Sequence, residues 1–344
     1  MTTRNLAAWA RNPVNGKLQW DSDPNWPIGL VADFRFFLRD TYYSVKSGVV
    51  WEGGSRAISA PPSKTEKGGV YGFGGSLDPT VDGSKEQRFS FNPMGDLYIK
   101  RRTYIPSNYF HRDTVKLAMT GDISTWVKGD TINGADGLKT GTLYYKSGTD
   151  IWLLFADSAN NAAYWVGTIT NTTKGQTATS TAKNLESANN KFFALWCDGY
   201  SSAGQSPTIV LHLVPNNTGG SRITFAYGHS GSGTGSQQNQ DGGTPDFIGA
   251  SDLGTYIDTI LHVQMATTEA GTDGKIDFWV RKQGQSYYSK IFNKTDWAIG
   301  ARSPLYAQFK NGYCWGWANS GYEVNTDFYE TQFMISETAI DGVA

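Results

Sequence analysis

Alternating apolar and polar positions are the clearest pattern in this chain. In residues 97–105 (LYIKRRTYI) the odd positions are mainly apolar, and the even positions are polar or aromatic. A period of two places the two sets on opposite faces of a β-strand, one buried and one turned to solvent. Pro106 ends the strand because proline has no N–H to donate to a neighbouring strand. The segment is therefore predicted to be one strand of a half-buried sheet.

The same alternation recurs along the rest of the chain. It is clearest in residues 208–214, 257–265 and 276–281. Further strands are predicted at 31–38, 49–59, 191–197, 222–227, 287–292, 305–309 and 327–335, with short pieces at 70–75 and 87–91. No window keeps a helical period, so the sheets must bury their apolar faces against each other. The pattern predicts an all-β protein built as a two-sheet jelly-roll sandwich.

Residues 120–186 differ from the rest of the chain in composition and in the length of the predicted strands. Short strand-like pieces alternate there with glycine turns and with stretches rich in Ser, Thr and Asn. Loop tips tolerate insertions, so 120–186 is predicted to be a small β domain inserted into a discontinuous jelly roll of residues 1–119 and 187–344. Residues 228–246 are rich in Gly, Ser and Gln and are predicted to form an exposed loop.

Composition supports many short strands. Glycine makes up 40 of 344 residues and aromatic residues make up 14%, and both suit turns and pleated sheets. The net charge of −1 supplies no basic field for nucleic acid or an anionic membrane. No apolar run approaches the roughly 18 residues of a membrane helix. Residues 1–17 lack the continuous apolar stretch of a secretory signal.

Metal and cofactor signals are weak. Cys197 and Cys314 lie far apart and follow no zinc-ligand spacing, and no glycine loop precedes a helix as in a phosphate site. No cofactor is predicted. A structural Ca²⁺ held by loop carboxylates, for instance near Asp33 or Asp327, suits such a fold, but no ligand spacing in a loop supports it.

Several stretches carry a resemblance to a known group of proteins. They are LYIKRRTYIPSNYFHRD (97–113), NNKFFALWCDGYS (189–201), PNNTGGSRITFAY (215–227) and GYCWGWANSGYEVNTDFYETQFMIS (312–336). Together they resemble concanavalin A-like lectin/glucanase-fold proteins of bacteriophages, which are distantly related to polysaccharide lyases. The resemblance covers most of the chain outside the insert. Within the insert, residues 126–148 resemble small β modules of phage structural proteins.

The resemblance implies a role on the virion surface, as a capsid decoration, fibre or tail-associated protein. Other virion proteins would then be its partners, host-surface polysaccharide its ligand, and a homo-oligomer its assembly state. Synthesis in the host cytoplasm would explain an extracellular-type composition without an export signal. A secreted enzyme whose leader has been removed would explain it too.

The polar strand faces are predicted to line up on one sheet as a glycan-binding surface. Its members are Tyr98, Lys100, Arg102, Tyr104, His212, His262, Gln264, Trp279 and Arg281. Aromatic rings stack on the apolar faces of pyranoses, and Arg, Gln and His form directional hydrogen bonds with hydroxyls and carboxylates. The opposing interpretation is a sheet face that is solvated, or covered by the insert, and binds nothing.

A lyase acting on a uronic acid polymer is the alternative function. It would need a cation for the substrate carboxylate, a base for the C5 proton and an acid for the leaving oxygen. The candidates are Arg102 or Arg281 as the cation, His212 or His262 as the base, and Tyr98 or Tyr104 as the acid. An aromatic-rich sheet offers these residue types by chance, so the sequence favours a non-catalytic protein.

Other candidate sites have weaker support in the sequence. A glycosidase needs two carboxylates in one site, and only Asp258 and Asp277 are predicted on polar strand faces. His111 is predicted in a loop, either as a structural hydrogen-bonding residue or as a ligand, and His229 in the exposed loop is given no role. Trp315, Trp317 and Tyr322 are predicted to lie in the core, with an interface as the alternative.

Overall fold

In the computed structural model, the described part of the chain comprises residues 20–21, 50–52, 58–66, 68–157, 159, 161–186, 189–197, 207–216, 218–229, 237–239, 247–267, 272–297, 308–337, 339–341 and 343. The predicted strand at 31–38 lies outside these residues, and so do Asp33 and parts of the predicted strands at 49–59 and 305–309.

One sheet of the sandwich has eight strands among the described residues. Its order is β20 (Ser289–Trp297), β19 (Gly274–Lys282), β18 (Thr255–Gln264), β7 (Asp96–Ile105), β23 (Thr326–Ser336), β4 (Gly68–Phe73) and β3 (Ile58–Ser59), with β1 (Trp20–Asp21) paired to β23. Every pairing is antiparallel. The predicted strand at 97–105 is therefore confirmed, and it pairs with β18 and β23 near the middle of this sheet.

The other sheet has nine described strands. Its order is β17 (Gln237–Asn239), β16 (Ser221–His229), β15 (Pro207–Pro215), β14 (Asn190–Trp196), β21 (Phe309–Cys314), β6 (Gln87–Met94) and β2 (Val50–Glu52), while the short β22 (Trp317–Ala318) pairs with β14 and with β5 (Gly83–Ser84). The prediction of a loop over 228–246 is wrong in part, because β16 runs to His229 and β17 lies inside the range.

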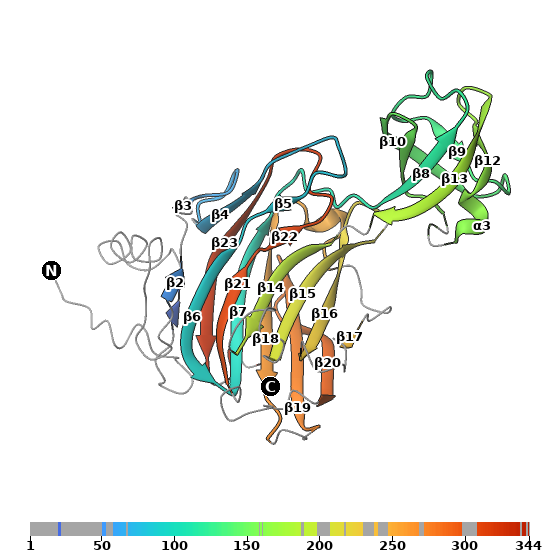
Figure 1. Cartoon of the computed structure of the whole chain (residues 1–344). Helices are drawn as coiled ribbons and strands as arrows, with labels where there is room; N and C mark the ends of the chain where they lie inside the picture. Colours follow the sequence, from blue (N-terminus) through green and yellow to red (C-terminus); the bar gives the residue numbers. More distant parts are fainter. Residues whose placement is uncertain are drawn as a thin grey trace.

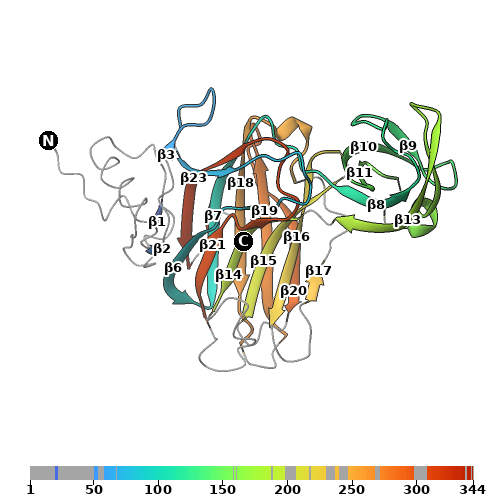
Figure 2. The ribbon, with the colours of Figure 1, turned by 45° about the horizontal axis from the view of Figure 1, so that its top comes forward.

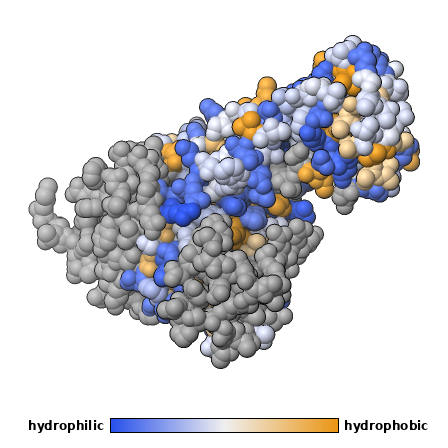
Figure 3. Space-filling model, in the orientation of Figure 1, coloured by the Kyte–Doolittle hydropathy of each residue, from blue (hydrophilic) through white to orange (hydrophobic). Residues whose placement is uncertain are grey.

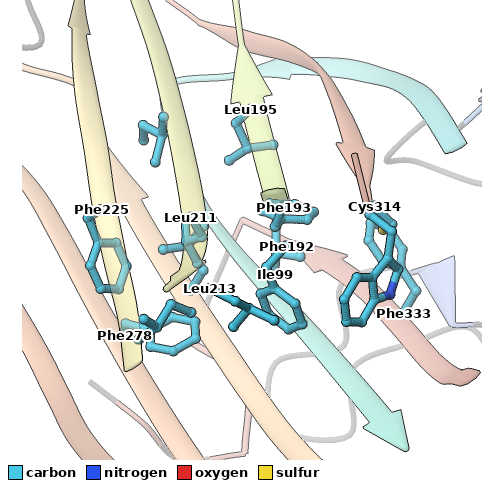
Figure 4. Packing of buried hydrophobic residues seen from close by; sticks show 14 of the residues in the cluster. Ile99, Phe192, Phe193, Leu195, Leu211, Leu213, Phe225, Phe278, Cys314 and Phe333 are labelled. Atoms are coloured by element: carbon cyan, nitrogen blue, oxygen red, sulfur yellow. The ribbon is translucent and has the colours of Figure 1, made fainter. Parts of the chain in front are cut away.

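The two sheets pack face to face around one aromatic-rich core (Figure 4). Phe225 of one sheet lies 5.4 Å from Phe278 of the other between ring centroids, and Phe89 lies 5.0 Å from Phe333. These contacts join apolar faces of strands far apart in sequence, as burial of two half-apolar sheets requires. The chain is an all-β protein whose main body is a two-sheet sandwich, as predicted.

A separate closed barrel projects from one end of the sandwich (Figures 1 and 2). Its strands are β8 (Thr114–Thr120), β9 (Thr131–Asn133), β10 (Thr140–Ser147), β11 (Asp150–Leu154), β12 (Gly167–Asn171) and β13 (Gln176–Glu186). It has its own core around the buried Trp126 and Trp165. The barrel strands begin at Thr114 rather than at the predicted boundary of residue 120.

A single helical turn, α3 (Ala162–Trp165), lies within the barrel. The side chain of Asn161 caps it by accepting a hydrogen bond of 3.0 Å from the Ala163 N–H. Four residues are too short to produce a helical period, which is why the sequence pattern did not predict this turn. Among the described residues, no helix is long and apolar enough to span a membrane.

Candidate functional site

Eight of the nine predicted ligand residues lie on the outer face of the eight-stranded sheet. The register pairs Tyr98 with His262, and it places Asp258 opposite both Arg102 and Arg281. His212 does not join them, because β15 belongs to the nine-stranded sheet. The prediction that all nine share one face is therefore wrong for His212, and the two histidines lie on opposite sheets.

The arginines of this face are neutralised from within the protein. Asp258 is buried and accepts from Arg102 Nη1 at 3.2 Å and from Arg281 Nη2 at 2.6 Å. Arg102 also donates from Nε to Glu66 at 3.1 Å. Asp258 was predicted to be solvent-facing, and its burial corrects that prediction. Both guanidiniums therefore already have carboxylate partners, so neither is free to neutralise a substrate carboxylate.

His262 is held in a network rather than left free to act as a base. Its Nε2 lies 2.8 Å from Asp96, its Nδ1 lies 3.3 Å from Asp277, and its ring stacks on Tyr98 with centroids 4.1 Å apart. Asp277 is buried, which corrects its predicted exposure. Burial alone would raise the pKa of Asp277, but hydrogen bonds from Lys275, Asn293 and His262 lower it below its ordinary value.

The C-terminal residues cover part of the same face. Ile340 and Val343 are buried against Ile260 and Trp279, and the Asp341 carboxylate lies 2.9 Å from Lys100 Nζ. Trp279 and Tyr104, predicted to face solvent, are buried. Burial raises the pKa of Tyr104. Tyr104 lies in a separate buried cluster with Tyr256 and Tyr329. A sugar chain could not reach the ring of Trp279 without displacing the residues that cover it.

The outer face of the nine-stranded sheet carries a second group of polar residues. The register places Lys191 opposite His212 and His212 opposite Thr224, and Val214 opposite Arg222. Burial lowers the pKa of His212 to about 4, and the charge of Lys191 adds to the effect. The imidazole is therefore neutral at pH 7, and its Nε2 has no hydrogen-bond partner among the described residues.

Asp113 accompanies Arg222 at the edge of this group. Burial raises the pKa of Asp113 to about 6, and the positive charge of Arg222 offsets part of that rise. The Nε of Arg222 is buried without a hydrogen-bond partner.

Trp317 stands at the end of the same face. Its side chain is 45% exposed, which corrects the prediction that it lies in the core. Its Nε1–H donates to Asp82 Oδ2 at 3.0 Å, and the other oxygen of Asp82 accepts from the Ser320 N–H at 2.9 Å. An exposed indole is therefore held in one orientation by a bidentate carboxylate. Trp315 and Tyr322 are buried in the core, as predicted.

Two lysines flank the strand that carries Trp317. Gly316 donates to the carbonyl of Lys191 at 2.7 Å and accepts from the Lys85 N–H at 3.4 Å. Asn190 pairs with Ala318, and both are buried, so alternation turns Lys191 and Trp317 outward together. A Cβ on Gly316 would lie 3.0 Å from the Lys191 Cβ and from the Tyr313 ring. A larger residue at position 316 would therefore require the Lys191 side chain or the Tyr313 ring to shift by a few tenths of an ångström.

Neither amine of these lysines has a carboxylate within 4.0 Å among the described residues. We call this group the Trp317 platform. Its members are Lys191, His212, Arg222 and Trp317. On the coloured part of the surface in Figure 3, hydrophobic side chains lie at several separate places.

The backbone conformation explains why alternation along the sequence did not predict that Trp317 is exposed. Trp315 and Trp317 have the same parity, which predicts the same side of a strand. Trp315 adopts a positive φ of 51°, so the alternation breaks there, and one indole enters the core while the other faces solvent. The unusual WGW sequence was the only signal available.

The remaining sequence candidates have structural roles or lie outside the described side chains. His111 is buried, with Nδ1 2.6 Å from the hydroxyl oxygen of Ser221 and 3.2 Å from that of Tyr109. Burial lowers its pKa to about 3. The side chain of His229 is not described. Among the described residues, no group of three His, Cys, Asp or Glu side chains is placed to hold a metal ion, and the buried Cys197 and Cys314 form no disulfide there.

No family model and no curated protein sequence matches the chain. Solved structures similar to it include alginate lyase Aly36B, at 9% identity and a TM-score of 0.42, with 94% of this chain and 98% of that chain covered. A legume lectin-like domain from Entamoeba histolytica matches at 7% identity and a TM-score of 0.30, covering 78% of this chain and 90% of that chain.

A third similar structure is the CBM2 module of the evolved Dit of Lactobacillus casei BL23 phage J-1. It matches at 6% identity and a TM-score of 0.32, covering 92% of this chain and 94% of that chain.

Proposed function

We propose that this protein is a non-catalytic, glycan-binding component of a bacteriophage particle surface, and that it binds an acidic polysaccharide on the Trp317 platform. The observation that carries the proposal is the exposed indole of Trp317, which Asp82 holds in place, next to the strand that carries Lys191, whose amine has no carboxylate within 4.0 Å among the described residues. An indole face packs against the C–H face of a pyranose, and ammonium groups pair with sugar carboxylates or sulfates.

The absence of catalysis is supported by the separation of the predicted catalytic groups. A lyase needs its base, acid and neutralising cation around one sugar unit. His212 and His262 belong to different sheets, and the guanidiniums of Arg102 and Arg281 are both paired with Asp258. The outer face of the eight-stranded sheet carries more of the residue types that a lyase needs, but its arginines are already paired with a carboxylate of the protein.

The particle surface is proposed from the sequence resemblance, which covers most of the sandwich. On this proposal other virion proteins and further copies of the chain are its assembly partners, and host polysaccharide is its ligand. Particle attachment is tested by labelling purified particles with an antibody to this chain.

Glycan binding is tested by titrating the protein with alginate and, as a neutral control, dextran, by isothermal calorimetry. We expect binding of alginate that weakens at least ten-fold in Trp317→Ala, while Tyr287→Ala, which removes another exposed aromatic side chain, binds normally. Loss in neither variant, or equal binding of dextran, would reject the acidic-glycan assignment to this platform.

Lyase activity is the second candidate, and one observation favours it. His212 is neutral at pH 7, has an unpartnered Nε2, and lies near the cation Lys191. A uronate bound there could lose its C5 proton to the imidazole, the C4–O bond would break, and the imidazolium would return the proton to the leaving oxygen. The test is the absorbance of the conjugated uronate product during incubation with alginate. A rise that disappears in His212→Ala but persists in His262→Ala would replace the non-catalytic proposal.

A further inference from the structure

The loop that carries Asp82 is clamped by a buried arginine from the sandwich–barrel connection. Arg112, two residues before β8, is completely buried. It donates from Nη1 to the Ser76 carbonyl at 2.6 Å and from Nη2 to the Asp78 carbonyl at 3.2 Å. Its Nε donates to the carbonyl of Ser320, the residue whose N–H is held by Asp82. One guanidinium thus joins the two loops that bear Asp82 and Trp317.

The barrel contacts the same two loops directly. Its Tyr145 hydroxyl donates to Asp78 Oδ2 at 3.3 Å, and its Tyr144 hydroxyl accepts from Arg112 at 2.9 Å. Lys128, also from the barrel, pairs with Glu323 at 2.6 Å in the loop that follows β22. The barrel is therefore fastened both to the loop that carries Asp82 and to the loop that follows β22.

The two loops also interlock through their backbones. Gly321 has a φ of +46°, and a Cβ at this position would lie 2.8 Å from the Val81 carbonyl oxygen. The Ser76 N–H donates to the Tyr322 carbonyl at 2.8 Å. A displacement of the loop at 76–82 would consequently move both Asp82 and the chain next to Trp317.

We propose that the barrel braces the Trp317 platform, and that Asp82 is the positioning residue through which this brace fixes the indole. The inference rests on the proposed function, since it treats the platform as the glycan site. A ring held in its binding orientation loses less conformational freedom when the ligand arrives, which strengthens binding without adding a contact. The insert would then serve recognition without touching the ligand.

The link between Asp82 and Trp317 is tested by a double-mutant cycle on alginate binding. Trp317→Phe keeps an aromatic ring but removes the N–H, and Asp82→Ala removes the acceptor. We expect each to weaken binding about ten-fold and the double variant to weaken it no further. Asp82→Asn should recover part of the loss because its amide oxygen still accepts one N–H. Additive losses, or no loss in Asp82→Ala, would overturn the role of Asp82.

The barrel's part is tested with a matched pair of tyrosine variants. Tyr145→Phe removes the hydroxyl that reaches Asp78, and Tyr164→Phe removes one from a barrel residue whose ring contacts Lys139 within the barrel. The readout is the indole N–H resonance of Trp317, assigned by its disappearance in Trp317→Phe. We expect faster hydrogen exchange and a shifted resonance in Tyr145→Phe alone.

An unchanged Trp317 resonance in Tyr145→Phe would overturn the brace. This readout needs no ligand, so it remains decisive if alginate does not bind. Absence of alginate binding by the unmodified protein would instead reject the proposed function, and the two failures are thereby distinguishable.

Discussion

Replacing Glu330 with glutamine removes one charge from an ion pair buried between the two sheets. Arg101 and Glu330 are joined side chain to side chain, with 3% and 4% of their side chains exposed. Glu330 Oε1 also accepts from Thr103 and from the indole of Trp315, each at 2.9 Å. Arg101 lies over the ring of Phe192, 4.0 Å from its centroid. Burial alone would lower the pKa of Arg101, but the charge of Glu330 contributes to raising it above its ordinary value.

The expected loss of folding stability in Glu330→Gln follows from these buried contacts. Glutamine keeps the shape and an accepting oxygen, so the packing and the bonds from Thr103 and Trp315 remain possible. The guanidinium of Arg101 becomes an unneutralised charge in an aromatic core. Breaking a buried pair from one side typically costs about 3–5 kcal/mol, which is a large part of the roughly 5–15 kcal/mol that stabilises a folded protein.

The assay is urea unfolding followed by intrinsic tryptophan fluorescence, with the sandwich and barrel transitions fitted separately because a two-part chain need not unfold in one step. We expect Glu330→Gln to lower the unfolding midpoint of the sandwich strongly. The double variant Arg101→Met/Glu330→Gln should recover much of the loss, because no charge is then left buried. A loss below about 1 kcal/mol in the single variant, the value typical of an exposed pair, would refute the reasoning.

Three further predictions concern other parts of the molecule. Because the pKa of His111 is lowered to about 3 from about 6.5 in an unfolded chain, the unfolded state binds more protons between these values. His111 therefore costs about 2 kcal/mol of stability on going from pH 7 to pH 5, and urea unfolding of His111→Asn should show a flatter pH profile. Ile340→Ala should lower stability by about 2–3 kcal/mol and increase quenching of Trp279 fluorescence by acrylamide, with Leu138→Ala, an exposed site, as a control without effect. Addition of EDTA should leave the thermal midpoint unchanged, whereas a clear fall would show a structural Ca²⁺.

Much of the sandwich was predictable from local pattern. Strand faces follow from alternation alone, because neighbouring side chains of a strand point to opposite sides. Leu97 and Ile99 are in the core, while Tyr98 and Lys100 lie on the outer face. Three of the segments with the clearest alternation became β15, β18 and β19, and the absence of a helical period implied that sheets pack on sheets.

The candidate site was not predictable in the same way. Alternation places a residue on a face of its own strand, but it does not say which strand lies beside it. His212 lies on a different sheet from His262 because β15 pairs with β14 and β16, through hydrogen bonds between segments chosen by the whole fold. A polar face can also be covered by chain from elsewhere, as residues 340–343 cover Trp279.

The sequence by itself thus determined the all-β class and the inward or outward direction of most side chains, because these depend on neighbours two residues away. Only the tertiary structure decided which polar residues gather, which are neutralised and which stay open. Asp258 faces outward from its strand yet is buried between Arg102 and Arg281. Trp317, in contrast, is exposed because the positive φ of Trp315 interrupts the alternation. Asp82, from a loop far away in the sequence, accepts the hydrogen bond that orients its ring. Contacts between distant segments, summed over the fold, set these outcomes.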